Sequence, residues 1–145
     1  MKRNAKKVAI LSITLILVAA AAVGFYMYNR GPVNIRTSRS TEINAKQLYQ
    51  EYQEDNINAR STYDEKILSV SGKVASISKN QQGEPVVKLE TATDGGYVNC
   101  TFQEQVSMNE GEMVKIKGLC TGMGQSEPEL GIPGDVYISR AIFIN

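Results

Sequence analysis

The sequence contains no histidine and no tryptophan, and its only cysteines are Cys100 and Cys120. Without histidine, neither a Ser-His-Asp triad nor a Cys-His pair can be assembled. The C-x-x-C redox motif is also missing. Two thiolates would need two further ligands to complete a zinc site, and histidine is the usual supplier. The sequence therefore predicts a protein that is not an enzyme and that has no metal or other cofactor.

Three pairs of acidic residues and one glycine-rich stretch are the other candidates for catalytic or phosphate-binding groups. The stretch GLCTGMG (residues 118–124) fits neither GxxxxGK[ST] nor a GxGxxG before a helix, so we interpret it as a turn. The acidic pairs fall at alternating or loop positions, which indicates solvated charge rather than a glycosidase cleft or a calcium site. These pairs are Asp64 with Glu65, Glu110 with Glu112, and Glu127 with Glu129.

Basic residues are concentrated at the amino-terminal end of the chain. Residues 1–30 contain five Lys and Arg residues and no acidic residue. From residue 31 onward, 11 Lys and Arg residues stand against 15 Asp and Glu residues, a net charge of −4. A protein that binds nucleic acid needs a basic surface to neutralise phosphates. The charge of the larger part of the chain therefore disfavours nucleic acid as a partner.

Residues 8–28 (VAILSITLILVAAAAVGFYMY) form an uncharged run of 21 residues. At about 1.5 Å per residue, a helix of this length spans about 31 Å, close to the roughly 30 Å of a bilayer core. The basic residues of the tail, residues 1–7, precede it, and Tyr26 and Tyr28 lie at its far end. By the positive-inside rule, this pattern predicts a single-pass membrane anchor with a cytoplasmic amino terminus.

A cleaved signal peptide is the alternative interpretation of the same run. A basic start, an apolar centre and the small residues 19–22 resemble such a signal. However, the chain stays apolar for six further residues, VGFYMY, where a cleaved signal would turn polar. We therefore expect an uncleaved anchor. Both interpretations export residues 31–145.

A polar segment and a short helix follow the apolar run. Residues 29–43 have scattered Arg, Ser and Thr without periodicity, so we expect a linker. The exported domain then spans residues 44–145. It opens with Asn44 and Gln47 in the spacing of a helix capping box. The apolar face of this predicted amphipathic helix consists of Ala45, Leu48, Tyr49 and Tyr52.

Five segments of the domain alternate between apolar and polar residues, as β-strands do. The first is long, and its apolar parity shifts after Gly72, which predicts a bulged and bent strand. An irregular stretch separates the third segment from the fourth. This outline predicts a mainly β domain with a five-stranded OB-fold, a Greek-key barrel; another small barrel or an open β-sandwich is the alternative. The segments are residues 66–78, 85–92, 97–102, 113–120 and 136–145.

The order of these features resembles that of the tRNA_anti-like family, OB-fold lipoproteins or membrane-anchored proteins of bacteria. The similar stretches are AKQLYQEYQEDNINA, ILSVSGKVASISK, VNCTF, GEMVKIKGLCTG and GDVYISRAIF, all within residues 44–145. The resemblance implies an OB-fold and an exported location. Together with the anchor, it places the domain on the outer, periplasmic side of a bacterial cytoplasmic membrane. It implies no particular activity, and the family name is not evidence of RNA binding.

The two cysteines fall on the inward faces of their predicted strands. Disulfides form in exported proteins, so a bridge between Cys100 and Cys120 is the prediction. In an OB-fold the third and fourth strands are separated by the fifth, and the bridge would have to cross the barrel interior or a tapered end. Two reduced thiols in the core remain the alternative, with a redox or metal role less favoured.

OB-folds bind ligands with their second and third strands and the loops beside them. That surface here carries amide side chains in the first turn and is flanked by residues 123–133. Of the aromatic residues only Tyr97 and Tyr137 are suitable for stacking, which is few for a single-stranded nucleic-acid platform. We expect a protein or glycan partner; nucleic acid, or no specific ligand, is the alternative. The candidate residues are Lys79, Asn80, Gln81, Gln82, Lys88, Tyr97, Asn99 and Thr101.

Overall fold

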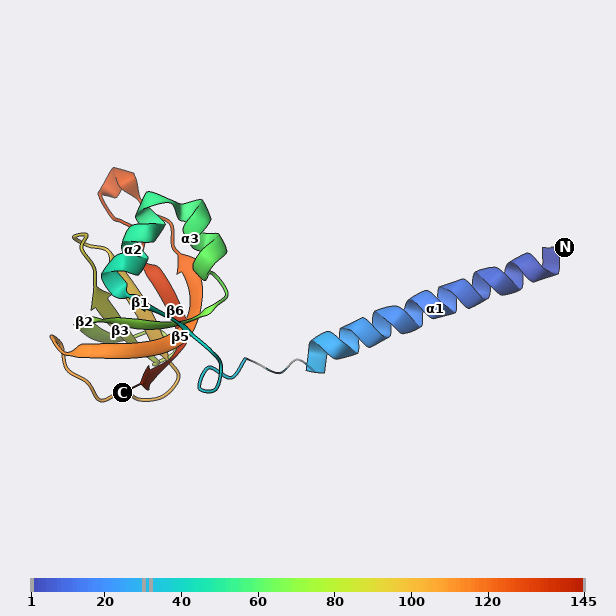
Figure 1. Cartoon of the computed structure of the whole chain (residues 1–145), viewed down its shortest axis with the longest axis horizontal. Coiled ribbons are helices and arrows are strands. Elements are labelled where there is room, and N and C mark those ends of the chain that lie inside the picture. The colour runs from blue at the N-terminus through green and yellow to red at the C-terminus, as the bar shows by residue number, and fades with distance from the viewer. Residues whose placement is uncertain (1, 30, 32, 145) are drawn as a thin grey trace. The chain divides into compact units, whose positions relative to one another are not determined.

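The computed structural model describes residues 2–29, 31 and 33–144 of the chain (Figure 1). The described residues divide into two compact units, one that ends at Val33 and one that begins at Asn34. The first unit consists mainly of one helix, and the second contains all of the described strands. We describe each unit by itself.

The helix α1 (Lys2–Asn29) contains the predicted apolar run. Within the described residues, it alone is long and apolar enough to cross a membrane. Its window of 18 residues, Ser12–Asn29, has a mean hydropathy of 1.6, and none of it is buried against protein. This length and composition fit both a membrane anchor and a signal sequence.

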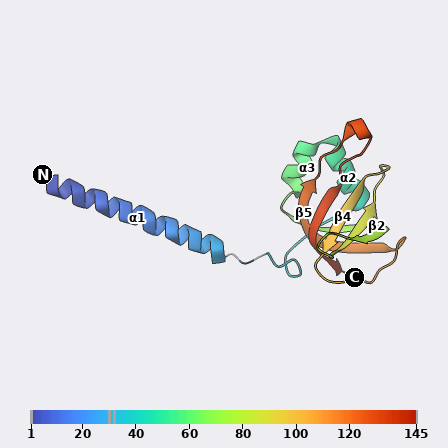
Figure 2. The same cartoon turned by 180° about the vertical axis from the view of Figure 1, so that it is seen from behind.

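The second unit is built on a closed five-stranded barrel with the strand order β2-β3-β4-β6-β5, closed by pairing of β5 with β2 (Figures 1 and 2). Strands β4 and β6 are parallel, and the other neighbours in the barrel are antiparallel. This topology is that of an OB-fold, as predicted. The strands are β2 (Ile67–Lys79), β3 (Pro85–Glu90), β4 (Tyr97–Phe102), β5 (Met113–Met123) and β6 (Val136–Ile144).

The long strand β2 bends between two neighbours, which closes the barrel. Its first half pairs with β5 and its second half with β3, with a register shift between Val74 and Ser76. A Cβ at Gly72 would lie 3.0 Å from the Cβ of Ala45 and 3.3 Å from that of Leu89. Glycine thus lets the bent strand approach its neighbours closely, and the predicted bulge is confirmed.

Two helices, α2 (Ala45–Glu54) and α3 (Asn56–Tyr63), lie over one end of the barrel (Figures 1 and 2). The Asn44 side chain accepts a hydrogen bond from the backbone N–H of Lys46 and so caps α2. The predicted apolar face of α2 is fully buried against the barrel. The sequence pattern did not distinguish α3 as a second helix.

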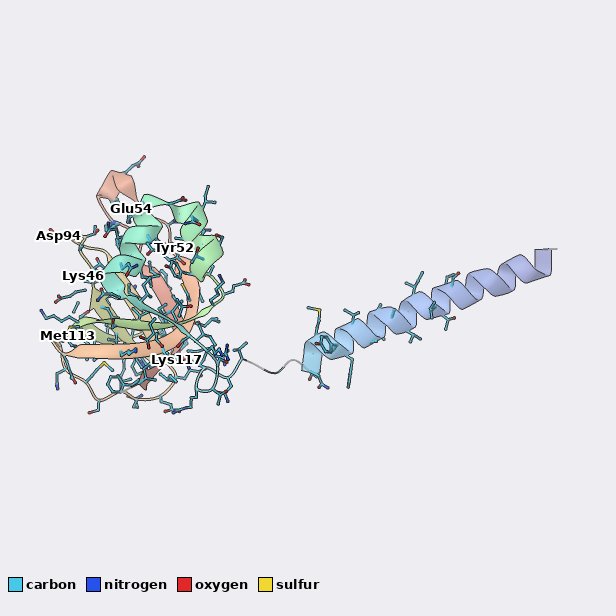
Figure 3. The ribbon with its side chains drawn as sticks, in the orientation of Figure 1. Lys46, Tyr52, Glu54, Asp94, Met113 and Lys117 are labelled. Carbon is cyan, nitrogen blue, oxygen red and sulfur yellow. The ribbon has the colours of Figure 1, made fainter. Side chains whose placement is uncertain are left out.

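Part of the predicted linker belongs to the barrel unit. Strand β1 (Thr41–Asn44) pairs in parallel with β2, and Ile35 is only 5% exposed. The ammonium group of Lys117, on β5, donates to the carbonyl oxygens of Arg36 at 3.2 Å and Ser38 at 2.6 Å (Figure 3). The compact unit therefore begins ahead of the predicted boundary at Asn44. Four-residue strands carry too little alternation to be recognised in a polar sequence.

The predicted disulfide is wrong, because Cys100 and Cys120 are buried free thiols. Ile138 on β6 pairs with Cys100 on one side and with Cys120 on the other. Two strand spacings separate the cysteine Cα atoms by about 10 Å in a flat sheet. A disulfide needs these atoms within about 7 Å. Both cysteines do face inward, as the alternation predicted, but the intervening strand β6 keeps the thiols apart.

Candidate functional site

The outer faces of β3, β4 and β6 form one surface, which we call the OB face. Strand register places Lys88 opposite Asn99, and Asn99 opposite Tyr137. Along β3 the buried residues alternate with half-buried ones, so Lys88 lies on the outer side. On β4 Tyr97 and Thr101 are half-buried, and on β6 Tyr137 is 43% exposed. The structure thus brings four of the predicted residues together: Lys88, Tyr97, Asn99 and Thr101.

A lysine and a tyrosine pair across the first two strands of the OB face. The ammonium group of Lys88 lies 5.1 Å from the centre of the Tyr97 ring, within the range of a cation–π contact. Beside it, Lys73 forms an ion pair of 3.1 Å with Glu90 at the end of β3. Both cationic side chains at this end therefore have partners.

Asn99 occupies the middle of the OB face and is 6% exposed, although its position in β4 predicted an outward, accessible side chain. The loop residue Asp135 holds this amide in place. Its carboxylate accepts from the backbone N–H of Tyr97 at 2.9 Å and from Asn99 Nδ2 at 2.6 Å. Asp135 was not among the predicted site residues. Its position immediately before β6 was the available signal, because β6 runs parallel to β4 and begins at the same end.

The other side-chain atom of this amide, Asn99 Oδ1, is buried and has no hydrogen-bond partner among the described residues. Asp135 fixes which way the amide points, since an ionised carboxylate only accepts hydrogen bonds and must face the NH₂ group. Buried polar atoms are rarely left unpaired, since burying one without a partner costs about 1–3 kcal/mol. The OB face therefore holds one oriented, unsatisfied acceptor.

The predicted amide-rich turn between β2 and β3 lies at the Thr101 end of the OB face. Asn80 Oδ1 accepts from the backbone N–H groups of Gln82 at 3.0 Å and Glu84 at 2.9 Å, and Asn80 Nδ2 donates to the Glu84 carboxylate at 2.8 Å. Both polar atoms of the Asn80 side chain are thus used in hydrogen bonds within the turn. Lys79, Gln81 and Gln82 are exposed at its rim.

The loop between β5 and β6 borders the opposite end of the OB face and contains a short 3-10 helix, η1 (Pro128–Leu130). The Tyr49 hydroxyl donates to the carbonyl oxygen of Gly134 at 2.8 Å and so ties the loop to α2. A Cβ at Gly124 would lie 2.9 Å from the ring of Tyr137, so glycine lets the ring lie against the backbone. The base of the loop is therefore fixed beside Asp135 and Tyr137.

Cys120 lies under the helices, apart from the OB face. The Tyr52 hydroxyl, which Figure 3 labels beneath α2 and α3, lies 3.4 Å from Cys120 Sγ and donates to the carboxylate of Asp64. Burial raises the pKa of the Cys120 thiol and of the Cys100 thiol above the usual value of 9.0. Both cysteines are therefore neutral thiols at physiological pH, which makes them poor nucleophiles. Within the described part of the chain, no group of three or more potential metal ligands occurs.

No curated protein matches the chain at a significant level. The family model of the tRNA_anti-like family matches residues 1–130, from the start of the chain into the loop before β6. The match covers most of the chain and includes four of the five barrel strands. The barrel has the OB-fold that the earlier resemblance implied. The chain belongs to the tRNA_anti-like family.

Proposed function

We propose that this chain is a non-catalytic, membrane-anchored module whose exported OB-fold domain binds a protein or an envelope polymer through the OB face. One observation carries the proposal: Asn99 Oδ1 is an oriented acceptor without a partner among the described residues, on the surface that OB-folds use for ligands. Tyr97, two residues along β4, and Tyr137, opposite on β6, provide ring surface next to it. No group with catalytic chemistry is part of the proposal.

The location is supported by the first unit. An apolar helix follows a basic, acid-free tail. That charge pattern favours a cytoplasmic amino terminus and an external, periplasmic barrel in a bacterial cytoplasmic membrane. Protease added to spheroplasts is expected to degrade the barrel unit. Protection of the barrel unit, with degradation of a known exported control, would contradict this orientation.

The binding role is tested by cross-linking the tagged full chain in intact cells and purifying it. Tyr137→Ala is the informative variant, because its ring is partly exposed and its loss leaves the core intact. We expect a specific set of species on the wild-type chain and its loss from the variant. Identical capture by both chains would contradict a binding role for the OB face.

Single-stranded nucleic acid is the alternative ligand. The Lys88–Tyr97 pair is the one feature that favours it, since stacking rings and basic groups make such platforms. The net charge of −4 from residue 31 onward opposes it. Titration with single-stranded DNA and RNA at low salt is expected to give a flat response. A saturable, salt-dependent response would support the alternative.

A further inference from the structure

The polar atoms at the centre of the OB face are mostly acceptors. Asp135 receives one hydrogen bond on each carboxylate oxygen, from the Tyr97 N–H and from Asn99 Nδ2, and each oxygen has a further lone pair. Asn99 Oδ1 has no partner among the described residues. A ligand that completes this centre must therefore bring hydrogen-bond donors.

The charges around the centre indicate that the donors are neutral groups. Lys88 is held over the Tyr97 ring, Glu90 is paired with Lys73, and Asp135 is already bonded twice. These groups leave no excess of either sign. A phosphate chain would need a basic surface, and a cationic peptide would be expected to meet several unpaired carboxylates.

Two aromatic rings lie next to Asn99 and offer apolar surface to a ligand. Tyr97 lies on the same strand two residues away, and Tyr137 lies opposite Asn99 on β6. Pyranose rings combine hydroxyl donors around their edge with C–H groups on their faces. Specific ligand sites likewise combine apolar or aromatic walls with a few well-placed polar groups. A protein interface of ordinary size would instead show an apolar centre with a polar rim.

We propose that the OB face binds a saccharide chain. Asn99 Oδ1 and Asp135 accept hydrogen bonds from hydroxyl or acetamido N–H groups of one sugar, and Tyr97 and Tyr137 contact the C–H faces of the chain. This inference rests on the proposed function and names the ligand class for the same site. Lys88 flanks Asn99 in register, and its ammonium group lies over the Tyr97 ring.

The test uses the full chain in detergent micelles and an oligomer of six N-acetylglucosamine units, with binding followed by calorimetry. Asn99→Leu keeps the size of the side chain and removes both the acceptor Oδ1 and the donor Nδ2. We expect at least a tenfold loss of affinity. The unfolding midpoint falls as well, because Asp135 loses one of its two donors. A purely structural amide would give a lower midpoint with unchanged affinity. Thr62→Val, at an exposed position on α3 outside the OB face, is the control and should bind within twofold of wild type.

Tyr137→Ala is a second variant, at a side chain that is 43% exposed and outside the core. It is expected to bind at least tenfold more weakly, and Tyr137→Phe, which keeps the ring, is expected to bind normally. The saccharide assignment is overturned if neither this oligomer nor an oligomer of glucose binds saturably to the wild-type chain. If cells still yield a protein cross-linked to wild type but not to Tyr137→Ala, the proposed function survives that failure. If capture is also indifferent to Tyr137, both proposals fail.

Discussion

The amide of Asn99, on β4, and the carboxylate of Asp135, the loop residue just before the parallel strand β6, are joined by a hydrogen bond of 2.6 Å. The same carboxylate accepts from the backbone N–H of Tyr97. The Asp135 side chain thus holds the first residue of β4 and orients an amide on the surface that OB-folds use for ligands. The Asn99–Asp135 pair therefore stabilises the barrel and also belongs to the proposed binding site.

Replacing Asp135 with alanine is expected to lower the free energy of unfolding by about 1–3 kcal/mol, because it removes the charged acceptor of two hydrogen bonds. Urea denaturation followed by circular dichroism measures the change. Glu129→Ala in the same loop, whose side chain is exposed, should stay within about 0.5 kcal/mol of wild type. Equal effects of the two substitutions would contradict the role of Asp135.

Gly118→Ala is expected to destabilise the barrel by about 1–3 kcal/mol through overpacking. The new methyl group would meet the Ile138 side chain and lie 3.0 Å from the carbonyl oxygen of Ser139. Backbone atoms cannot move aside as a side chain does. Met113→Ala on the same strand, where the side chain is 66% exposed, is the control and should change stability little. Denaturation midpoints that coincide would argue against this close approach of β5 and β6.

Lys117→Met is expected to release the segment before β1. Its ammonium group binds the carbonyl oxygens of Arg36 and Ser38, which a thioether cannot do. Limited trypsin digestion should then cut faster after Arg36 and Arg39 than in wild type. Lys115→Met removes an ion pair with the exposed Glu42 and should change this cleavage far less. Similar rates for all three chains would show that Lys117 does not hold the segment.

The two thiols are expected to resist alkylation in the native protein and to react after denaturation without reductant. Intact mass should then show two labels, because neither thiol is in a disulfide. A denatured, unreduced chain that takes no label would instead show a bridge.

The same thiols make stability depend on pH at the alkaline end. Burial raises the folded-state pKa of Cys100 and Cys120 above 9.0, so the folded chain keeps protons that the unfolded chain loses. Their contribution is complete below about pH 9 and declines as the pH rises above it. Denaturation midpoints of a Cys100→Ala, Cys120→Ala chain should therefore fall less steeply between pH 8 and pH 10 than those of wild type. Equal slopes would contradict this protonation linkage.

The regular strands and the face of α2 could be predicted because their side chains alternate with the period of their element. The bend in β2 was visible as a parity shift after Gly72. Two features were not visible. The pairing of Lys117 with carbonyl oxygens of residues 36 and 38 joins parts of the chain far apart in sequence. The four residues of β1 are too few to show a period.

The sequence predicted which residues share the face of the candidate site, but not the hydrogen bonds between their side chains. Alternation placed Lys88, Tyr97 and Asn99 on one face, and the register confirms this. Alternation cannot show that Asn99 is buried, nor that a loop residue, Asp135, orients its amide. Alternation placed both cysteines inward, and the predicted bridge failed because Ile138, on the intervening strand, separates them.

Binding through the OB face is the central claim, and site-specific photo-cross-linking in intact cells tests it most directly. A photoreactive amino acid replaces Tyr97 in one chain and Ile57, which is 84% exposed on α3, in another. The account predicts a discrete cross-linked product from position 97 that is absent from position 57. The same products from both positions, or none from position 97, would contradict it.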